Sequence, residues 1–358
     1  MIRLNNFGVL SLVGLLCAGL VACGGNDGPA APAADTSDGT SVTEAAAPAQ
    51  PVVVYSSRAE QLIQPIFTAF TEETGIAVEY ITDSAQPLIE RIKAEADTTP
   101  ASVLLTVDAG VLWYAAEQGI LQPMASDIVS AAVPQQYRDP DGLWTGLSLR
   151  ARTIVYDTRK VSADELVGYA DLADSRWAGK LCLRTSKKVY NQSLVATMIA
   201  SMGEEKTEEI VRGWVANLAQ PEFSNDTKLI EAIEDGRCQV GIVNSYYFGR
   251  LQRDNELSAA LFWQPAELGG VHVNVSGAGI TANAPNVAGA TALLEWLAGP
   301  AGQELFAGLN LEFPVLGDVP NDPIVAAWGE FAASEQPLID AGRLQADAVK
   351  LMARAGYN

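Results

Sequence analysis

Short apolar runs alternate along the chain with stretches in which apolar residues recur at helical spacing. From Pro51, VVVYSS has the pattern of a strand, and the next stretch places Leu62, Ile66 and Phe70 on one helical face that stops at Gly75. IAVEYIT and SVLLTV repeat the strand pattern, and a helical pattern follows each of them. Alternating strands and helices predict an α/β fold with a mostly parallel sheet.

The same alternation continues to the end of the chain. The strand patterns are LWTGLSLRARTIVYDT, GKLCLRT, CQVGIVN and HVNVSGAGIT, and the helical patterns are NQSLVATMIASMG, ALLEWLAG and GQELFAGL. With 358 residues and 48% hydrophobic content, the chain can bury enough apolar surface for two packed lobes.

The N-terminal 50 residues have a different composition. MIR, an apolar run and the small-residue stretch LVAC predict a signal peptide over 1–22. LVAC resembles the bacterial lipobox, which implies lipidation of Cys23 and anchoring of an exported protein to a membrane; a plain secretory signal is the alternative. Residues 23–50 are rich in Ala, Pro, Gly, Ser and Thr and predict a flexible tether. No later apolar run is long enough to cross a membrane.

The formal net charge of −20 disfavours binding to nucleic acid or to anionic lipid. Such a charge is compatible with a cationic ligand. The membrane is therefore expected to be reached only through the lipid anchor.

Two adjacent tyrosines, Tyr246 and Tyr247, stand where a buried strand pattern ends. Open parallel sheets place ligands beyond the carboxyl ends of their strands. Asn244 and Ser245 favour the start of a helix, which would turn both phenols toward one site near the positive end of the helix dipole. Packing in a core or an interface is the alternative for such a pair.

Cys182 and Cys238 each accompany a strand pattern, and each lies eight residues before a tyrosine, Tyr190 and Tyr246 respectively. If the two strands are neighbours, both tyrosines reach the same edge. An exported protein can form a disulfide between these cysteines, worth on the order of 4 kcal/mol; two unpaired buried cysteines are the alternative.

Three phenol groups at one edge suggest a hard trivalent cation. Ferric iron prefers oxygen ligands, and three phenolates neutralise its charge. Zinc fits poorly, because His272 is the only histidine and no closely spaced cysteine pair is present. His272 is expected in the core or in a hinge.

Five stretches resemble the periplasmic ferric-iron-binding proteins of bacterial ABC importers: VVVYSSR, LLTVDAGVLW, GLSLRARTIVYDT, LCLRTSKKVYNQSLVA and GRCQVGIVNSYYFGRL. The resemblance covers most of residues 51–345. It implies a type II periplasmic binding protein, with two α/β lobes joined by a hinge of extended crossing segments. It divides the chain into 51–148 (lobe one, first part), 149–276 (lobe two) and 277–358 (the return to lobe one, with C-terminal helices).

The resemblance also implies a ligand set. Tyr190, Tyr246 and Tyr247 are the implied ligands of Fe³⁺, held between the lobes. Many members add a His-Tyr pair where this chain has Ala59 and Glu60. Glu60 could supply a carboxylate instead, and the alternative is a solvated residue in the first turn of a helix.

Three arginines are candidates for holding a synergistic anion such as carbonate, because a guanidinium group matches a planar oxyanion. Arg152 is favoured over Arg150 and Arg58, and pairing or hinge packing is the alternative for each. The resemblance further implies a periplasmic protein, expected to be a monomer, that delivers iron to an inner-membrane ABC permease.

Enzymatic functions lack their motifs. VSGAG misses the first glycine of the hydrolase motif because Asn274 precedes it, and Pro285 interrupts the helix that GAGITA would need for a dinucleotide. We therefore expect a binding protein and no enzyme. Within the binding class, the alternative is a receptor for a small organic cation or anion that stacks on the tyrosines.

Overall fold

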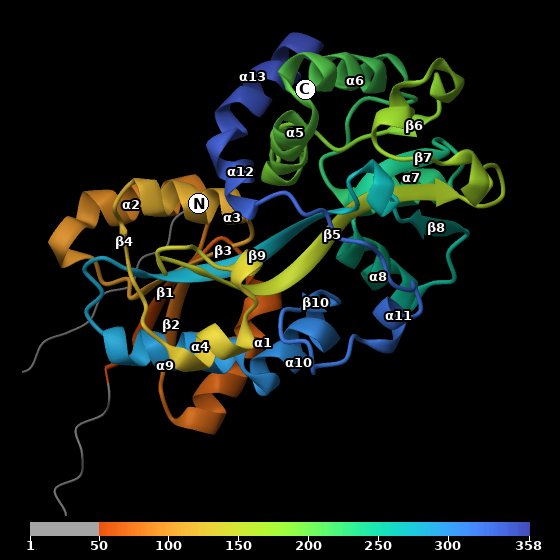
Figure 1. Ribbon diagram of the computed structural model, residues 1–358. Coiled ribbons are helices and arrows are strands. Elements are labelled where there is room, and N and C mark those ends of the chain that lie inside the picture. Colours follow the sequence, from red (N-terminus) through yellow and green to blue (C-terminus); the bar gives the residue numbers. More distant parts are fainter. Residues whose placement is uncertain (1–49) are drawn as a thin grey trace, which may run out of the picture. The chain divides into compact units, whose positions relative to one another are not determined.

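A single mixed sheet of ten strands runs through residues 50–358, the part of the chain that this computed structural model describes (Figure 1). Its order is β2-β1-β3-β9-β5-β7-β6, with β4 beside β9 and with β8 and β10 beside β5. The strands are β1 Val52–Ser56, β2 Val78–Thr82, β3 Val103–Thr106, β4 Leu121–Gln122, β5 Thr145–Asp157, β6 Leu181–Cys182, β7 Val240–Asn244, β8 Ala259–Phe262, β9 His272–Thr281 and β10 Phe313–Pro314.

The prediction of a mostly parallel sheet is wrong. Only the pairs β1–β2, β1–β3 and β6–β7 are parallel among the described strands, whereas β5 and β9 pair antiparallel with each other and with all their other neighbours. The physical reason is the path of the chain, because β5 carries it out of the first lobe and β9 carries it back. These two long, almost fully buried strands are the predicted extended crossing segments.

The first lobe surrounds β1, β2 and β3. Its core is formed by apolar faces of helices such as α1, which buries Ile63, Ile66 and Phe70 and ends at Gly75 in a left-handed conformation (φ 72°), as expected. Its helices are α1 Glu60–Thr74, α2 Ala85–Glu95, α3 Ala109–Glu117, α4 Asp127–Ala132, α9 Val287–Ala298 and α10 Pro300–Asn310.

The second lobe surrounds β6, β7, β8 and the far half of β5. Two separate apolar cores lie in it, one containing Trp214 and one containing Cys182 and Cys238. Its helices are α5 Val189–Met202, α6 Glu204–Ala216, α7 Asp226–Glu234 and α8 Ser245–Asp254. Short 3₁₀ turns occur at η1 Ala96–Thr98, η2 Gln135–Tyr137, η3 Ala163–Glu165, η4 Ala170–Ala173, η5 Ser175–Trp177 and η6 Ala266–Leu268.

The C-terminal segment contacts both lobes (Figure 1). After α11 (Pro323–Ala326), helix α12 (Leu338–Arg343) packs on α3 and on α5, and α13 (Gln345–Ala355) packs on α5 and α6. Gly110 and Gly342 allow the close approach of α3 and α12, because a methyl group on Gly110 would lie 2.9 Å from the Gly342 nitrogen. The span 277–358 therefore contributes to the core of the second lobe as well as to the first.

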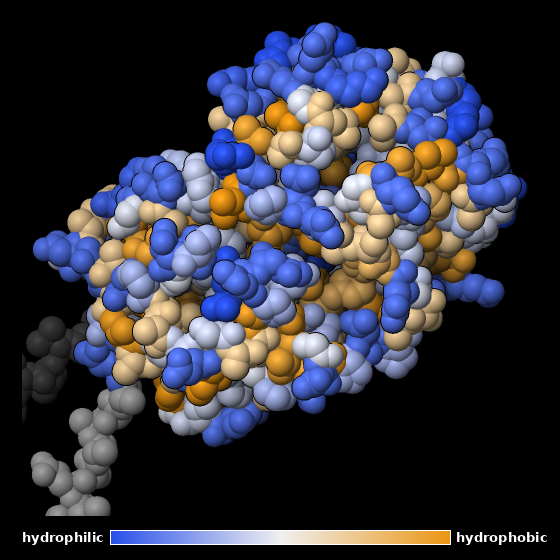
Figure 2. Space-filling view, viewed as in Figure 1, coloured by the Kyte–Doolittle hydropathy of each residue, from blue (hydrophilic) through white to orange (hydrophobic). Residues whose placement is uncertain are grey.

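The predicted signal peptide, the lipidation of Cys23 and the tether over 23–50 lie outside the described residues, except for Gln50 at its boundary. Within residues 50–358, no helix is both long enough and apolar enough to cross a bilayer. Figure 2 shows apolar residues interspersed with a largely hydrophilic surface on the face in view.

Candidate metal centre

The three candidate tyrosines come together from two helix N-termini. Tyr190 lies in the first turn of α5, and Tyr246 and Tyr247 lie in the first turn of α8, directly after β7. The Tyr246 hydroxyl donates to the Tyr190 hydroxyl at 3.4 Å, and the rings of Tyr246 and Tyr247 have centroids 4.3 Å apart. The helix expected to begin at Asn244 and Ser245 is confirmed, although the Asn244 side chain makes no capping hydrogen bond.

Burial favours the protonated phenols of Tyr190 and Tyr246. Burial raises the pKa of Tyr190 above its ordinary value, and nearby Arg150 and Arg184 oppose the rise. Burial raises the pKa of Tyr246 further, and its neighbours Tyr190 and Tyr247 add to the effect because adjacent phenolates would repel one another. Ionisation of Tyr190 and Tyr246 near neutral pH therefore requires a strong cation.

Guanidinium groups surround the tyrosine rings. Arg150 lies 4.9 Å from the Tyr190 ring centroid, and Arg184 lies 5.2 Å from the same ring. Arg250, one turn after the tyrosine pair on α8, lies 4.9 Å from the Tyr246 ring centroid. Sequence reasoning missed Arg184 and Arg250; the helical spacing of Arg250 was the only local signal for either residue.

The candidate arginines differ in how fully their donors are used. Arg152 donates through all three guanidinium nitrogens, to the Asn191, Asn244 and Asp226 side chains and to the Ile242 carbonyl. Arg150, in contrast, has no hydrogen-bond partner for either terminal nitrogen among the described residues. Within residues 50–358, unpartnered guanidinium nitrogens also occur on Arg58 (Nε), Arg184 (Nε and Nη1) and Arg250 (Nη2), but none occurs on Arg152, the candidate favoured from the sequence. Of the three candidates, Arg150 has both terminal nitrogens without a partner.

The hydrogen-bond partners of Arg58 and Glu60 are groups other than Tyr190, Tyr246 and Tyr247. Arg58 is buried, forms a 2.7 Å ion pair with Glu312 and donates to the Ser276 hydroxyl at 2.8 Å. These contacts match the hinge-packing alternative. Glu60 is exposed in the first turn of α1 and accepts a 3.4 Å hydrogen bond from the Tyr80 hydroxyl, which matches its solvated alternative.

A second buried carboxylate organises the arginines of the second lobe. Asp226 lies 3.2 Å from Arg152 and 3.5 Å from Arg184, and it accepts a 2.9 Å hydrogen bond from the Asn244 backbone nitrogen. The backbone two residues before Tyr246 and an arginine that faces Tyr190 thus both contact the Asp226 carboxylate. This network fixes the spatial relation between the starts of α5 and α8.

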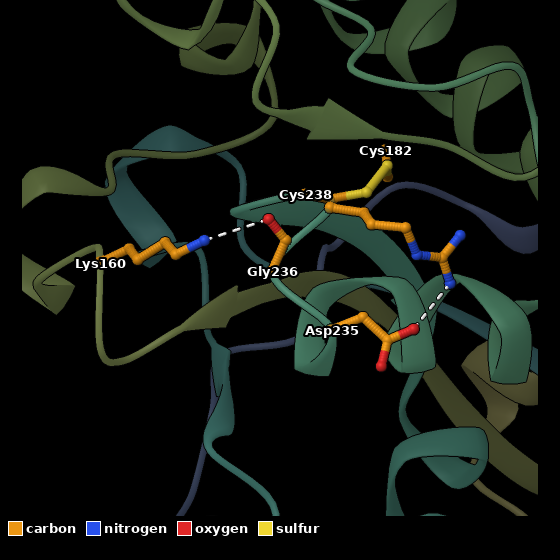
Figure 3. The surroundings of a disulfide bond; sticks show 6 residues. Lys160, Cys182, Asp235, Gly236 and Cys238 are labelled. Atoms are coloured by element: carbon orange, nitrogen blue, oxygen red, sulfur yellow. Dashed lines mark hydrogen bonds and ion pairs between the residues drawn. A yellow bond between two sulfur atoms is a disulfide. The ribbon is translucent and has the colours of Figure 1, made fainter.

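Cys182 and Cys238 form a disulfide in the structure, with Cα atoms 5.9 Å apart (Figure 3). Cys182 ends β6, and Cys238 lies two residues before β7, its parallel neighbour. The strands are neighbours as expected, but the matched register is wrong, because Cys182 pairs with Gly241, three residues beyond Cys238. Beside the disulfide, Lys160 donates to the Gly236 carbonyl at 3.1 Å. The disulfide thereby joins the two strands that lead toward Tyr190 and Tyr246.

Nitrogen and sulfur ligands do not offer a competing site in residues 50–358. Histidine, cysteine, aspartate and glutamate side chains nowhere gather there in a group of three that could hold a metal. His272 is buried at the start of β9, as expected for a hinge residue, and its Nδ1 lies 3.1 Å from the Thr197 hydroxyl. Burial lowers the pKa of His272 to about 3, so its ring is neutral.

Tyr190 lines a narrow crevice that has no room for a water-sized group in this structure. The residues that line it are Arg150, Arg152, Tyr190, Asn244, His272 and Asn274. Arg150 and one candidate phenol thus line the same crevice, which would have to widen to admit an anion. Phenolates for a hard cation and a guanidinium for an oxyanion are the two chemistries that this arrangement combines.

Comparison with known proteins identifies the family to which the chain belongs. The family model for bacterial extracellular solute-binding proteins matches residues 98–330. Iron uptake protein A1 of Synechocystis is 41% identical over 345 residues, 94% of this chain and 93% of that protein. A structure of Trichodesmium FutA with iron and citrate ligands matches with a TM-score of 0.81 and 40% identity, over 86% of this chain and 100% of that one.

Apo ferric ion-binding protein A of Pasteurella haemolytica also matches, with a TM-score of 0.81 and 36% identity over 86% of this chain and 98% of that one. These relatives are solute-binding proteins of the predicted type II fold, not enzymes. By the family match and by these identities, the chain belongs to the bacterial extracellular solute-binding proteins, in the group that contains the periplasmic ferric-iron-binding proteins.

Proposed function

We propose that this protein captures ferric iron through the phenolates of Tyr190, Tyr246 and Tyr247 and serves iron uptake. The observation that carries the proposal is the convergence of three phenols from the N-termini of α5 and α8, with two hydroxyls 3.4 Å apart. Hard oxygen donors suit ferric iron, and three phenolates balance its charge. The positive ends of two helix dipoles favour the phenolate form.

The remaining coordination positions of the iron fall to an exogenous anion. Ferric iron takes more ligands than three, and the sequence carries Ala59 and Glu60 where many relatives have a His-Tyr pair. The two terminal nitrogens of Arg150 have no hydrogen-bond partner within residues 50–358, and this guanidinium lies beside the Tyr190 ring, so Arg150 is our candidate for binding carbonate or a carboxylate of a chelator. The Trichodesmium relative, which was solved with iron and citrate, supports an anion of this class.

The chain's role in transport follows from its family. We infer that the iron-loaded protein works in the periplasm, anchored through Cys23, and delivers its cargo to an inner-membrane ABC permease. The relatives named for iron uptake and for periplasmic iron binding support this placement. The lobes would close on the cargo by rotation about β5 and β9, the strands that connect them.

Titration of the apo-protein with ferric citrate in bicarbonate buffer tests the proposal. Phenolate bound to ferric iron gives a visible charge-transfer band, so we expect a saturable one-to-one band. The variants Tyr190→Phe and Tyr246→Phe/Tyr247→Phe should lose it, whereas Tyr80→Phe, which lies on β2 of the first lobe, should keep it. A wild-type protein without the band would refute ferric-tyrosinate binding and favour an organic ion as the ligand.

The anion component has its own test. Arg150→Leu removes the free guanidinium donors, so the band should form more weakly and depend less on bicarbonate. Arg152→Leu would remove donors that are already used internally, and we expect it to destabilise the fold instead. An unchanged bicarbonate dependence in Arg150→Leu would exclude Arg150 as the anion site.

A further inference from the structure

Asp108 is a buried carboxylate that joins the two lobes and the hinge. It follows β3 in the first lobe and caps α3, where its Oδ1 accepts hydrogen bonds from the backbone nitrogens of Gly110 (2.9 Å) and Val111 (3.2 Å). Its Oδ2 accepts a 2.6 Å hydrogen bond from the Ser193 hydroxyl on α5 of the second lobe and a 2.8 Å hydrogen bond from Asn274 on β9. A single side chain thus contacts three parts of the fold.

The same carboxylate balances the positive charge of Arg150, the arginine that faces Tyr190. Asp108 Oδ2 lies 3.6 Å from Nη2 of Arg150, whose terminal nitrogens have no hydrogen-bond partner in residues 50–358. Arg150 in turn lies 4.9 Å from the Tyr190 ring centroid. Ser193 is three residues after Tyr190 on α5, so its hydrogen bond holds the turn that carries the phenol.

From these contacts we propose that Asp108 is a positioning residue for iron capture: it couples docking of the first lobe against α5 to the placement of Tyr190 and Arg150. The proposal rests on the proposed function, because Tyr190 is there an iron ligand. Asp108 itself touches neither the phenols nor the iron. When the lobes separate, Ser193 moves away from the carboxylate, and the turn bearing Tyr190 is released.

The chemistry of Asp108 fits this role. Every polar group that contacts it is a donor, and the acceptor-only ionised carboxylate satisfies all of them. Burial raises the pKa of Asp108 above its ordinary value, whereas Arg150 and the hydrogen bond from Ser193 oppose the rise. Breaking such a buried arrangement leaves Arg150 without its charge partner, which is strongly unfavourable.

The rate of iron release from the loaded protein measures how strongly Asp108 couples the docking of the lobes to the placement of Tyr190 and Arg150. The variants Asp108→Asn and Ser193→Ala should release ferric iron to an excess of a competing chelator about tenfold faster than wild type, because each loses a hydrogen bond to an ionised group across the lobes. Asparagine still caps helices well, so α3 should remain intact. The double variant should release iron no faster than either single variant, because both changes remove the same contact between Asp108 and Ser193.

A matched control is Asp157→Asn, which removes another buried carboxylate, one that pairs with Arg159 at the far end of β5. It should keep the wild-type release rate. Wild-type release in both Asp108→Asn and Ser193→Ala, with the band formed normally, would overturn the proposal.

Hydrogen exchange on the apo-proteins tests the role of Asp108 separately from the proposal that the protein binds ferric iron. Amide protons in the first turns of α5 should exchange faster in Asp108→Asn and Ser193→Ala than in Asp157→Asn. If wild type forms no ferric-tyrosinate band, the proposed function fails, but this comparison still decides whether Asp108 holds α5. Equal exchange rates for these amide protons in all three variants would refute the proposal that Asp108 holds the first turn of α5.

Discussion

Iron binding by this protein should release protons, and its affinity should therefore rise with pH. Burial raises the pKa of Tyr190 and of Tyr246 above the ordinary value of about 10, so both phenols carry protons in the apo-protein near neutral pH. Iron coordination requires the phenolates, so the loaded state holds at least two protons fewer than the apo state. The binding constant must increase as the pH rises.

The magnitude follows from the number of phenols. Each proton displaced contributes about 1.4 kcal/mol to the binding free energy for every pH unit, so two phenols contribute about 2.7 kcal/mol per unit. The affinity should rise roughly a hundredfold for each pH unit between about pH 6 and 8 on account of Tyr190 and Tyr246 alone.

Competition titrations against a ferric chelator, followed by the charge-transfer band at several pH values, measure the slope. The chelator and ferric hydrolysis contribute their own protons, so the informative quantity is the difference between proteins. Tyr246→Phe should show a slope lower than wild type by about one proton. Equal slopes in wild type and Tyr246→Phe would show that Tyr246 is not a ligand that ionises on binding.

Two further predictions concern the scaffold of the site. Replacing Cys182 and Cys238 with serine should lower the free energy of unfolding by about 4 kcal/mol, measured with urea under non-reducing conditions; a loss below about 1 kcal/mol would contradict a stabilising disulfide. Gly249→Ala should destabilise by about 1 to 3 kcal/mol and weaken the iron band, because the added methyl group would lie 2.9 Å from Trp328 and displace α8. Gly308→Ala, where the methyl group meets open space, should be neutral or stabilising; a similar loss in both variants would contradict the packing argument.

Local sequence determined most of the elements and the identity of the candidate phenols. Helical spacing of apolar residues located the helices α1, α5, α9 and α10. Extended patterns located the long strands β5 and β9, which are buried on both faces and therefore show no alternation between core and solvent. Tyr246 and Tyr247 could be identified because strand, cap and tyrosines are adjacent in sequence. The pairing of Cys182 with Cys238 depended on neighbouring strands, which the structure provides.

Only the tertiary structure decided which strands pair parallel or antiparallel and which groups each buried arginine contacts. Arg150 and Arg152 are two residues apart on β5 and both buried, so local pattern cannot separate them. Arg152 donates to Asp226, a partner 74 residues away, whereas Arg150 pairs with Asp108 and has no hydrogen-bond partner for its terminal nitrogens within residues 50–358. Which donors remain available depends on distant groups that folding brings together, and a one-dimensional pattern records only the burial of each residue, not the partner it will meet.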